Sequence, residues 1–277
     1  MNDPFAFCEE VIRQRDHDLF LATLFVPAEA RPHLFALYAF AEEIGHVADA
    51  VSEPMAGQIR LQWWRDALEG KNAPAEHPVL EALTAAIEKH SLPRDVLASF
   101  VDAHEFDLSG EPMPSLSALD QFLDATTGAI AGLAMRILDA QAAAREARAA
   151  FLFGRASGLM QKLRTVAKDA SQGRVFIPVD ILERNGGAVA DVLAGNGTDA
   201  IKNALAVLRK KISTDYDALK LEFVRGPVRA ALLRAPFIPL YLRQMEKPGY
   251  EPFTSRIELS QLRKQFVLWR TARFETI

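Results

Sequence analysis

Apolar residues recur at three- and four-residue steps along nearly the whole of this 277-residue chain. Leu97, Phe100, Val101 and His104 illustrate the spacing, which places side chains on one face of an α-helix. No alternating run of convincing strand length is present, and β-branched residues are sparse. We therefore predict an all-α fold. The expected helices cover residues 4–15, 17–25, 28–51, 55–69, 78–90, 94–108, 116–138, 144–171, 198–223, 227–245 and 256–273.

The breaks between these helices are rich in turn-forming residues. They include Gly70–Pro74, Leu108–Pro114, Arg184–Gly187 and Lys247–Gly249. None is long enough to be an interdomain linker, and no repeat of 20–50 residues is apparent. We expect a single domain over residues 1–277, with the long apolar helices at 116–138 and 144–171 at its centre.

Composition excludes several classes of protein. A net charge of −4 gives no electrostatic case for nucleic-acid binding. A single cysteine, Cys8, excludes an internal disulfide framework and indicates a reducing compartment, and we interpret it as a buried or half-buried thiol. No apolar run reaches the roughly 18 residues of a membrane span, and no secretory signal is visible. These features predict a cytoplasmic protein.

Two segments carry most of the functional information, Val26 to Asp49 and Phe151 to Pro178. The second reads as a helix with small residues at 154, 156 and 158 on one face, followed by a Gly-Arg turn before Ile-Pro. Together they resemble the two signature helices of the squalene/phytoene synthase family, whose enzymes join prenyl diphosphates. The resemblance covers roughly residues 15–245. Its further motifs are Ala36–Phe40, Leu61–Asp66, Asp102–Asp107, Gly128, Leu163–Arg164 and Gly173–Pro178.

The resemblance implies an isoprenoid-synthase-type helical bundle around a central cleft. In active members, magnesium ions held by aspartates at i and i+4 on two facing helices neutralise the departing diphosphate. Here Gly45 and His46 stand where the first helix usually has acidic residues, and Asp49 is kept. In the second helix Thr165 replaces the leading aspartate and Lys168 the glutamate, so that only Asp169 remains. At the two named positions of the family's Gln-x-x-Asn motif, this chain has Gly158 and Gln161.

One carboxylate per helix therefore survives and one cation has been added. A lysine opposes a divalent ion by about 4 kcal/mol at 4 Å and an effective dielectric of 20. We expect no catalytic residue, no cofactor and no metal, with Asp49 and Asp169 as the ligands if a metal binds.

Other family positions have also changed. Asp18, Leu19 and Phe20 replace a Ser-Phe-Tyr motif, and the stretch from Phe122 to Gly132 lacks the usual tyrosines. Arg31, Arg164 and Arg174 match basic positions that would meet phosphate oxygens in an active relative. Pairing with nearby carboxylates or helix-terminal carbonyls is the competing interpretation. The expected vestigial cleft or diphosphate site thus comprises Phe20, Arg31, Gly45, His46, Asp49, Phe122, Gln161, Arg164, Thr165, Lys168, Asp169 and Arg174.

Three further features allow two interpretations each. His46 and Asp49 could form half of a transition-metal site or could simply be a polar pair. We favour the polar pair, because no second His or Cys motif accompanies them. Trp63 and Trp64 point about 100° apart on a helix, which favours core packing over a membrane or stacking role. The segment 256–273 is an amphipathic basic helix, either a solvated outer face or a contact for an anionic membrane or acidic partner. Its basic residues are Arg256, Arg263, Lys264, Arg270 and Arg273.

Within the family, the chain most resembles the branch of NADH dehydrogenase (complex I) assembly factors, whose aspartate motifs are also degenerate. The shared features are Arg15-Asp16, Phe25–Glu29, Arg60–Trp63 and 175–178. The resemblance implies a non-catalytic protein that helps to assemble complex I, with complex I subunits or assembly proteins as partners and an isoprenoid or lipid as a candidate cleft ligand. It also implies a location in the cytoplasm or peripheral on the inner membrane, on the matrix side in eukaryotic relatives. The alternatives are an active magnesium-dependent prenyl diphosphate transferase with an altered metal site, and a peripheral membrane adaptor without a ligand.

Overall fold

A computed structural model describes residues 3–71 and 76–274. Over this part of the chain the structure is all-α, as predicted, and contains no strand. The first half consists of α1 (Pro4–Arg15), α2 (His17–Thr23), α3 (Arg31–Gly45), α4 (Pro54–Leu68), α5 (Pro78–His90), α6 (Arg94–Ala103) and α7 (Phe106–Ser109). Proline lies in the first turn of α1, α3, α4 and α5, where a missing N–H costs no helical hydrogen bond.

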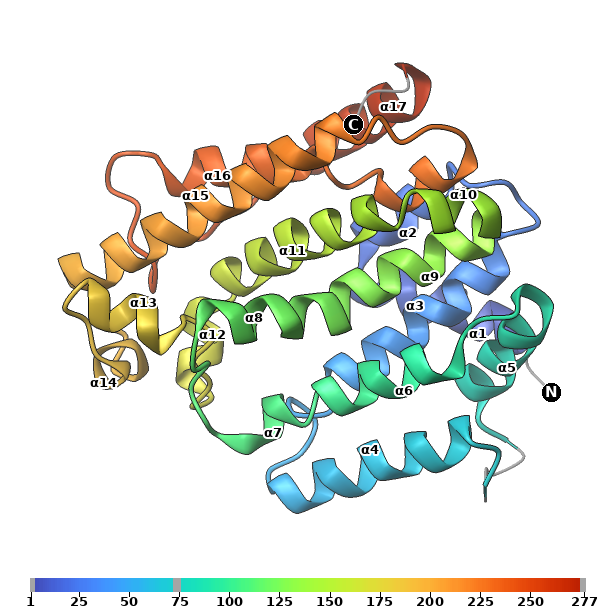
Figure 1. Cartoon of the computed structure of the whole chain (residues 1–277), viewed down its shortest axis with the longest axis horizontal. Helices are drawn as coiled ribbons and strands as arrows, with labels where there is room; N and C mark the ends of the chain where they lie inside the picture. The colour runs from blue at the N-terminus through green and yellow to red at the C-terminus, as the bar shows by residue number, and fades with distance from the viewer. Residues whose placement is uncertain (1–2, 72–75, 275–277) are drawn as a thin grey trace.

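The second half contains the long central helices. It comprises α8 (Leu116–Leu123), the π-helix η1 (Asp124–Gly128), α9 (Ala129–Leu138), α10 (Ala140–Arg145), α11 (Ala147–Arg164), α12 (Val166–Ser171), α13 (Val179–Arg184), α14 (Val189–Leu193), α15 (Asp199–Leu221), the 3₁₀ helix η2 (Pro227–Leu232), α16 (Phe237–Met245) and α17 (Gln261–Phe274). In Figure 1, α11 and the continuous α8–η1–α9 rod run through the middle, with α15 on one side and α6 and α4 on the other.

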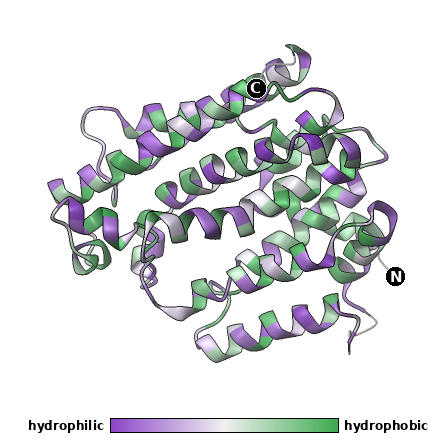
Figure 2. Ribbon diagram, in the orientation of Figure 1, coloured by the Kyte–Doolittle hydropathy of each residue, from purple (hydrophilic) through white to green (hydrophobic). Residues whose placement is uncertain are grey.

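Most of the longer helices bury an apolar face. Figure 2 shows hydrophobic and hydrophilic residues on different sides of the helices. Among the bulkiest buried side chains, Phe35 and Phe40 of α3 lie in one cluster, and Leu119 and Leu123 of α8 in another. Cys8 is buried, and burial raises the pKa of its thiol to about 12, in agreement with the interpretation of an inert thiol.

The small residues of α11 form a helix crossing. A methyl group on Gly154 would lie 2.3 Å from the Gly128 Cα, and one on Gly158 would lie 2.4 Å from the Thr127 hydroxyl oxygen. The same hydroxyl donates a hydrogen bond of 2.8 Å to the Gly154 carbonyl. The glycines therefore allow α11 to contact η1 at backbone distance.

Several predicted helix boundaries were wrong. The helix expected at 144–171 is divided at Glu146 and Thr165, and the one expected at 227–245 begins as the 3₁₀ helix η2. Residues 256–260 are not helical, because Ile257 and Leu259 are buried and alternate with exposed neighbours, a period-2 pattern that only an extended chain can satisfy. The short helices α13 and α14 were not predicted.

Trp64 is buried against Phe40, with ring centroids 5.1 Å apart, and Trp63 packs on His77 at 4.9 Å. The expectation of core packing for these tryptophans is confirmed. Within the described residues, no helix is both long enough and apolar enough to cross a bilayer.

Candidate functional site

Asp49 lies in the turn that follows α3, and two cations from a distant part of the chain bind its carboxylate. The Lys168 Nζ donates a hydrogen bond of 2.7 Å to Oδ2, and the Arg174 Nη2 donates one of 2.7 Å to Oδ1. Both carboxylate oxygens are thus hydrogen-bonded to cationic donors of the protein itself.

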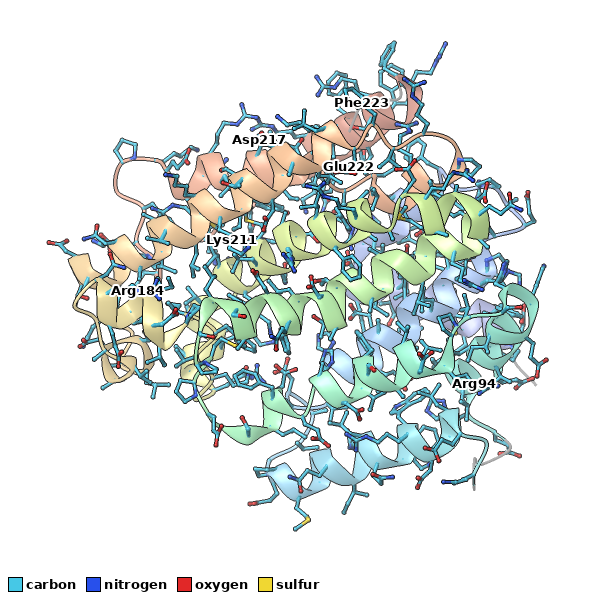
Figure 3. All side chains as sticks on the ribbon, viewed as in Figure 1. Arg94, Arg184, Lys211, Asp217, Glu222 and Phe223 are labelled. Carbon is cyan, nitrogen blue, oxygen red and sulfur yellow. The ribbon has the colours of Figure 1, made fainter. Side chains whose placement is uncertain are left out.

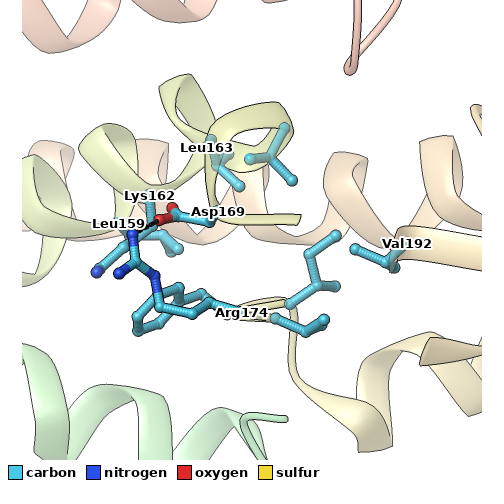
Figure 4. A pocket seen from close by; sticks show the side chains of 10 residues that line it. Leu159, Lys162, Leu163, Asp169, Arg174 and Val192 are labelled. Carbon is cyan, nitrogen blue, oxygen red and sulfur yellow. Dashed lines mark hydrogen bonds and ion pairs between the residues drawn. The ribbon is translucent and has the colours of Figure 1, made fainter. Parts of the chain in front are cut away.

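Asp169 of α12 is buried and is the second carboxylate of the site. Thr165 donates from its hydroxyl to Oδ2 over 2.7 Å, and the same Arg174 nitrogen that binds Asp49 lies 3.1 Å from Oδ1. Figure 4 shows Arg174 directed at Asp169. Arg174 also donates to the side-chain oxygen of Gln172. One guanidinium therefore joins the two surviving acidic residues.

The end of α12 explains how Arg174 reaches this position. The Gly173 N–H donates to the Ala170 carbonyl, and the Arg174 N–H donates to the Asp169 carbonyl. This pair of bonds is a Schellman motif, which requires a left-handed residue, and Gly173 has φ +77°. The Gly-Arg turn read from the sequence is thus the helix cap that places Arg174 beside Asp169.

The electrostatics of the site are balanced internally. Burial alone would raise the pKa of Asp49, but hydrogen bonds from Lys168 and Arg174 outweigh it and lower that pKa to about 2. Burial would lower the pKa of Arg174, but its bonds to Asp49 and the charge of Asp169 raise it. At neutral pH the site holds two carboxylates and two cations, a net charge of zero.

A half-buried lysine lies next to this site. The Lys162 Nζ lies 3.4 Å from the centre of the Phe176 ring and 3.8 Å from Asp107 Oδ1. Burial lowers the pKa of Lys162, and Asp107 opposes that shift. On its other oxygen, Asp107 faces His104 Nε2 at 3.9 Å. The sequence did not lead us to predict that Lys162, Asp107 and His104 lie together. Two features could have indicated it: Asp107 belongs to the family motif Asp102–Asp107, and Lys162 lies among apolar residues of a predicted helix.

Aromatic side chains fill the space around Lys162. Phe106, Phe122 and Phe176 contact one another with ring centroids 5.6–6.0 Å apart. The enclosed hollow beside Lys162, Asp169 and Arg174 has a volume of about 10 Å³, room for no more than about one water molecule (Figure 4).

The remaining predicted site residues divide into two groups. Phe122 and Gly45 lie close to His104: the Phe122 ring centroid is 6.0 Å from that of the imidazole, and a methyl group on Gly45 would lie 3.7 Å from its Nε2. His46 is half-exposed and its Nδ1 lies 2.9 Å from the Glu42 carbonyl, in a contact separate from Asp49.

Phe20, Arg31, Arg164 and Gln161 have partners elsewhere. Phe20 stacks on Phe35 at 5.9 Å, and the Arg31 Nε donates to the Val26 carbonyl over 2.8 Å. The Arg164 guanidinium lies 4.1 Å from the Tyr241 ring centre and donates to Gln161 over 3.0 Å. None of these contacts of Arg31 and Arg164 is with a carboxylate. Arg174 alone of the three arginines joins the acidic site, and its pairing with Asp169 is the kind of contact that the competing interpretation expects.

A model of the squalene/phytoene synthase family matches residues 12–263. The chain belongs to the squalene/phytoene synthase family. Its relatives include the rat NADH dehydrogenase (ubiquinone) complex I assembly factor 6, which is 27% identical over 255 residues, or 91% of this chain and 76% of the relative. The human assembly factor 6 is likewise 27% identical, over 89% of this chain and 75% of its own length. A presqualene diphosphate synthase from Sinorhizobium fredii is 25% identical over 89% of this chain and 90% of that enzyme.

Solved structures confirm the isoprenoid-synthase type of fold. A dehydrosqualene synthase crystallised in complex with ligand superposes with a TM-score of 0.85 at 21% identity, over 98% of this chain and 96% of that one. The squalene synthase HpnC from Alicyclobacillus acidocaldarius gives a TM-score of 0.74 at 21% identity, over 90% and 95% of the two chains. The family fold is therefore kept.

Proposed function

We propose that this protein is a catalytically silent member of its family that acts in the assembly of respiratory complex I. The observation that carries the first part is the position of Arg174. Its guanidinium joins Asp49 to Asp169, where carboxylates free to bind metal would be needed for diphosphate ionisation.

The residues present do not fit a magnesium cluster. Magnesium takes oxygen ligands in near-octahedral geometry, generally from one or two carboxylates and the substrate phosphates. Each oxygen of Asp49 and Asp169 already accepts a hydrogen bond, three of the four from a cationic donor. A metal ion would have to displace Arg174 and Lys168 and would leave both cations near its own positive charge.

The aromatic packing favours a protein-binding role over an isoprenoid-binding one. A prenyl chain entering beside Asp169 would have to displace Phe176, since the hollow that it lines measures only about 10 Å³ and Phe106 and Phe122 pack against its ring. The small residues Gly154 and Gly158 are likewise occupied by the contact with η1.

The assembly role is supported by the relatives. Assembly factor 6 proteins from several mammals match 89% or more of this chain. We therefore propose that this chain, too, has complex I subunits or assembly proteins as partners.

Two experiments test the proposal. In the first, purified protein is incubated with magnesium and farnesyl or geranylgeranyl diphosphate, and released diphosphate is measured. We expect no release above that of the Asp49→Ala variant. Turnover that Asp49→Ala or Asp169→Ala abolishes would establish the alternative, an active prenyl diphosphate transferase.

The second experiment deletes the gene in its source cell and quantifies assembled complex I on native gels. We expect the assembled complex to fall while succinate dehydrogenase activity is unchanged, with recovery on re-expression of the wild-type chain. Normal complex I levels in the deletion strain would refute the assembly role.

A further inference from the structure

Helix α17 turns an apolar ridge toward solvent. The buried face of the helix consists of Lys264, Val267, Leu268 and Thr271. On the opposite face Leu262 is 80% exposed, Phe266 58% and Trp269 50%. Their spacing of four and three residues places the three side chains on one stripe. The fold therefore packs the more polar side of α17 inward and leaves its largest apolar side chains exposed on the outer side of the helix.

The exposed aromatic rings form a continuous strip. The ring centroids of Phe266 and Trp269 are 6.1 Å apart, and those of Trp269 and Phe274 are 6.0 Å apart. Phe274 is itself 60% exposed. We call Leu262, Phe266, Trp269 and Phe274 the α17 ridge.

The end of α15 carries two further exposed apolar side chains. Leu221 is 71% exposed and Phe223 is 70% exposed, and Phe223 adopts a left-handed backbone conformation with φ 49°, which is unusual for a bulky residue. Arg229 fixes α17 beside this region by donating to the carbonyls of Thr271 and Ala272. Figure 3 labels Phe223, just beyond the end of α15.

Arginines flank the ridge. Arg263 and Arg270 project from one side of it and Arg273 lies within it, as follows from their positions on the helical wheel. All three are exposed, and none is within ion-pair distance of a carboxylate in the described part of the chain. Because the whole chain carries a net charge of −4, this is a local concentration of positive charge on an acidic protein.

We infer that the α17 ridge docks on the surface of a bilayer that contains anionic lipids. A convex stripe of Leu, Phe and Trp suits insertion at the acyl–headgroup boundary, and the neighbouring arginines suit lipid phosphates. A 14-residue helix anchored by Arg229 lies along the surface, and no described helix is able to span the membrane.

The structure also corrects the earlier list of basic residues for this segment. Lys264 is 9% exposed and its Nζ donates to Asp18 over 2.7 Å, so it holds α17 to α2 and takes no part in the outer surface. The docking surface deepens the proposed function, because a factor that serves a membrane complex gains from binding at the membrane. Its test uses purified protein and does not depend on complex I.

The test is flotation of the whole chain with vesicles of phosphatidylcholine, with and without 30% phosphatidylglycerol. We expect flotation with the anionic vesicles, a strong decrease at high salt, and little binding to phosphatidylcholine alone. The double variant Phe266→Ser/Trp269→Ser should lower partitioning at least tenfold. The triple variant Arg263→Gln/Arg270→Gln/Arg273→Gln should lower it about fivefold for each arginine.

Matched controls use exposed residues far from α17. Met55 and Ile59 are 67% and 64% exposed and lie four residues apart on α4, so Met55→Ser/Ile59→Ser removes a similar apolar pair. Arg184→Gln/Lys210→Gln/Lys247→Gln removes the same charge from other surfaces. Both controls should float as the wild type does.

Tryptophan emission reports the depth of insertion. Anionic vesicles should shift the emission of the wild type to the blue and leave that of Trp269→Phe unshifted, although this variant still floats. Three results would overturn the inference: no flotation of the wild type, wild-type flotation of Phe266→Ser/Trp269→Ser, or a concentration-dependent dimer that this double variant abolishes.

Discussion

The Lys168 ammonium group binds the Asp49 carboxylate across 119 residues of sequence, with Nζ 2.7 Å from Oδ2. Family resemblance implies an acidic residue at position 168, facing the same region as Asp49. The substitution therefore converts a repulsive pair that needs a metal ion into an attractive pair that needs none. Arg174 completes the change, since it binds Asp49 and Asp169 at once.

Removing the charge of Asp49 should destabilise the fold. Asp49→Asn leaves Lys168 without its carboxylate and Arg174 with Asp169 alone, and we expect a loss of about 1–3 kcal/mol in the free energy of unfolding, as for hydrogen bonds to charged groups. Chemical denaturation at pH 7 measures it. As a control, Glu10→Gln weakens an exposed pair with Arg13 and should cost less than about 0.5 kcal/mol. Equal losses in the two variants would argue against a structural role for the Asp49 cluster.

Restoring the family's acidic residues should restore a response to metal. The double variant Thr165→Asp/Lys168→Glu places three carboxylates near Asp49, and their mutual repulsion should lower the melting temperature in chelator. Millimolar magnesium should raise it again by several degrees, because an ion that binds only the folded state stabilises it. Neither the wild type nor Lys168→Ala should respond to magnesium. A magnesium-dependent rise in the melting temperature of the wild type would contradict the conclusion that Lys168 and Arg174 already balance the two carboxylates.

The crossing of α11 and η1 should tolerate no added methyl group. In Gly154→Ala the new Cβ would meet the Gly128 backbone at 2.3 Å, so the two helices must separate, and we expect a cost of at least 1–3 kcal/mol. Gly132→Ala on α9 is the matched control, since its Cβ would lie 3.8 Å from the Ala150 Cβ. That variant should be neutral or stabilised by up to about 1 kcal/mol through helix propensity. Thermal unfolding of the two variants measures the difference.

Local pattern and motif order were enough to predict the helices and the family. Apolar spacing in α8 is regular, because the helix is buried on one side. In α3 every residue from 33 to 40 is buried, so the helix was predicted from a nearly continuous apolar run. The break at Thr165 was missed, because a polar side chain in a helix pattern does not reveal that its hydroxyl will bind Asp169 instead of solvent. The break at Glu146 was missed as well.

Contacts between distant segments could not be predicted. The residues Asp49, Lys168 and Asp169 were identified by alignment with family motifs, but nothing in the sequence indicated that Arg174 would lie between the two carboxylates. The small residues of α11 were placed on one face, but the sequence did not indicate that Gly154 and Gly158 would contact η1. The contacts of the small residues of α11 depend on where η1 lies, and the sequence alone does not give that position.

Glu43 on α3 should make stability depend on pH near neutrality. Burial raises its pKa from the ordinary 4.5 to about 7, against the opposing charge of Arg15. The groups that face it include Cys8, which stays protonated, and His77, whose Nε2 lies 3.5 Å from Oε2 and whose pKa burial lowers. Between pH 4.5 and 7 the folded state binds more protons at this site than the unfolded chain, so the stability contribution falls as pH rises through this range and is constant above it.

Glu43→Gln should remove this slope and gain about 1–3 kcal/mol over the wild type above pH 7, because the buried charge no longer has to form. Urea denaturation at half-unit steps from pH 4.5 to 8 measures both curves. The exposed Glu81→Gln on the neighbouring helix α5 should follow the wild-type curve. Parallel curves for Glu43→Gln and the wild type would show that the Glu43 carboxyl titrates at its ordinary pKa.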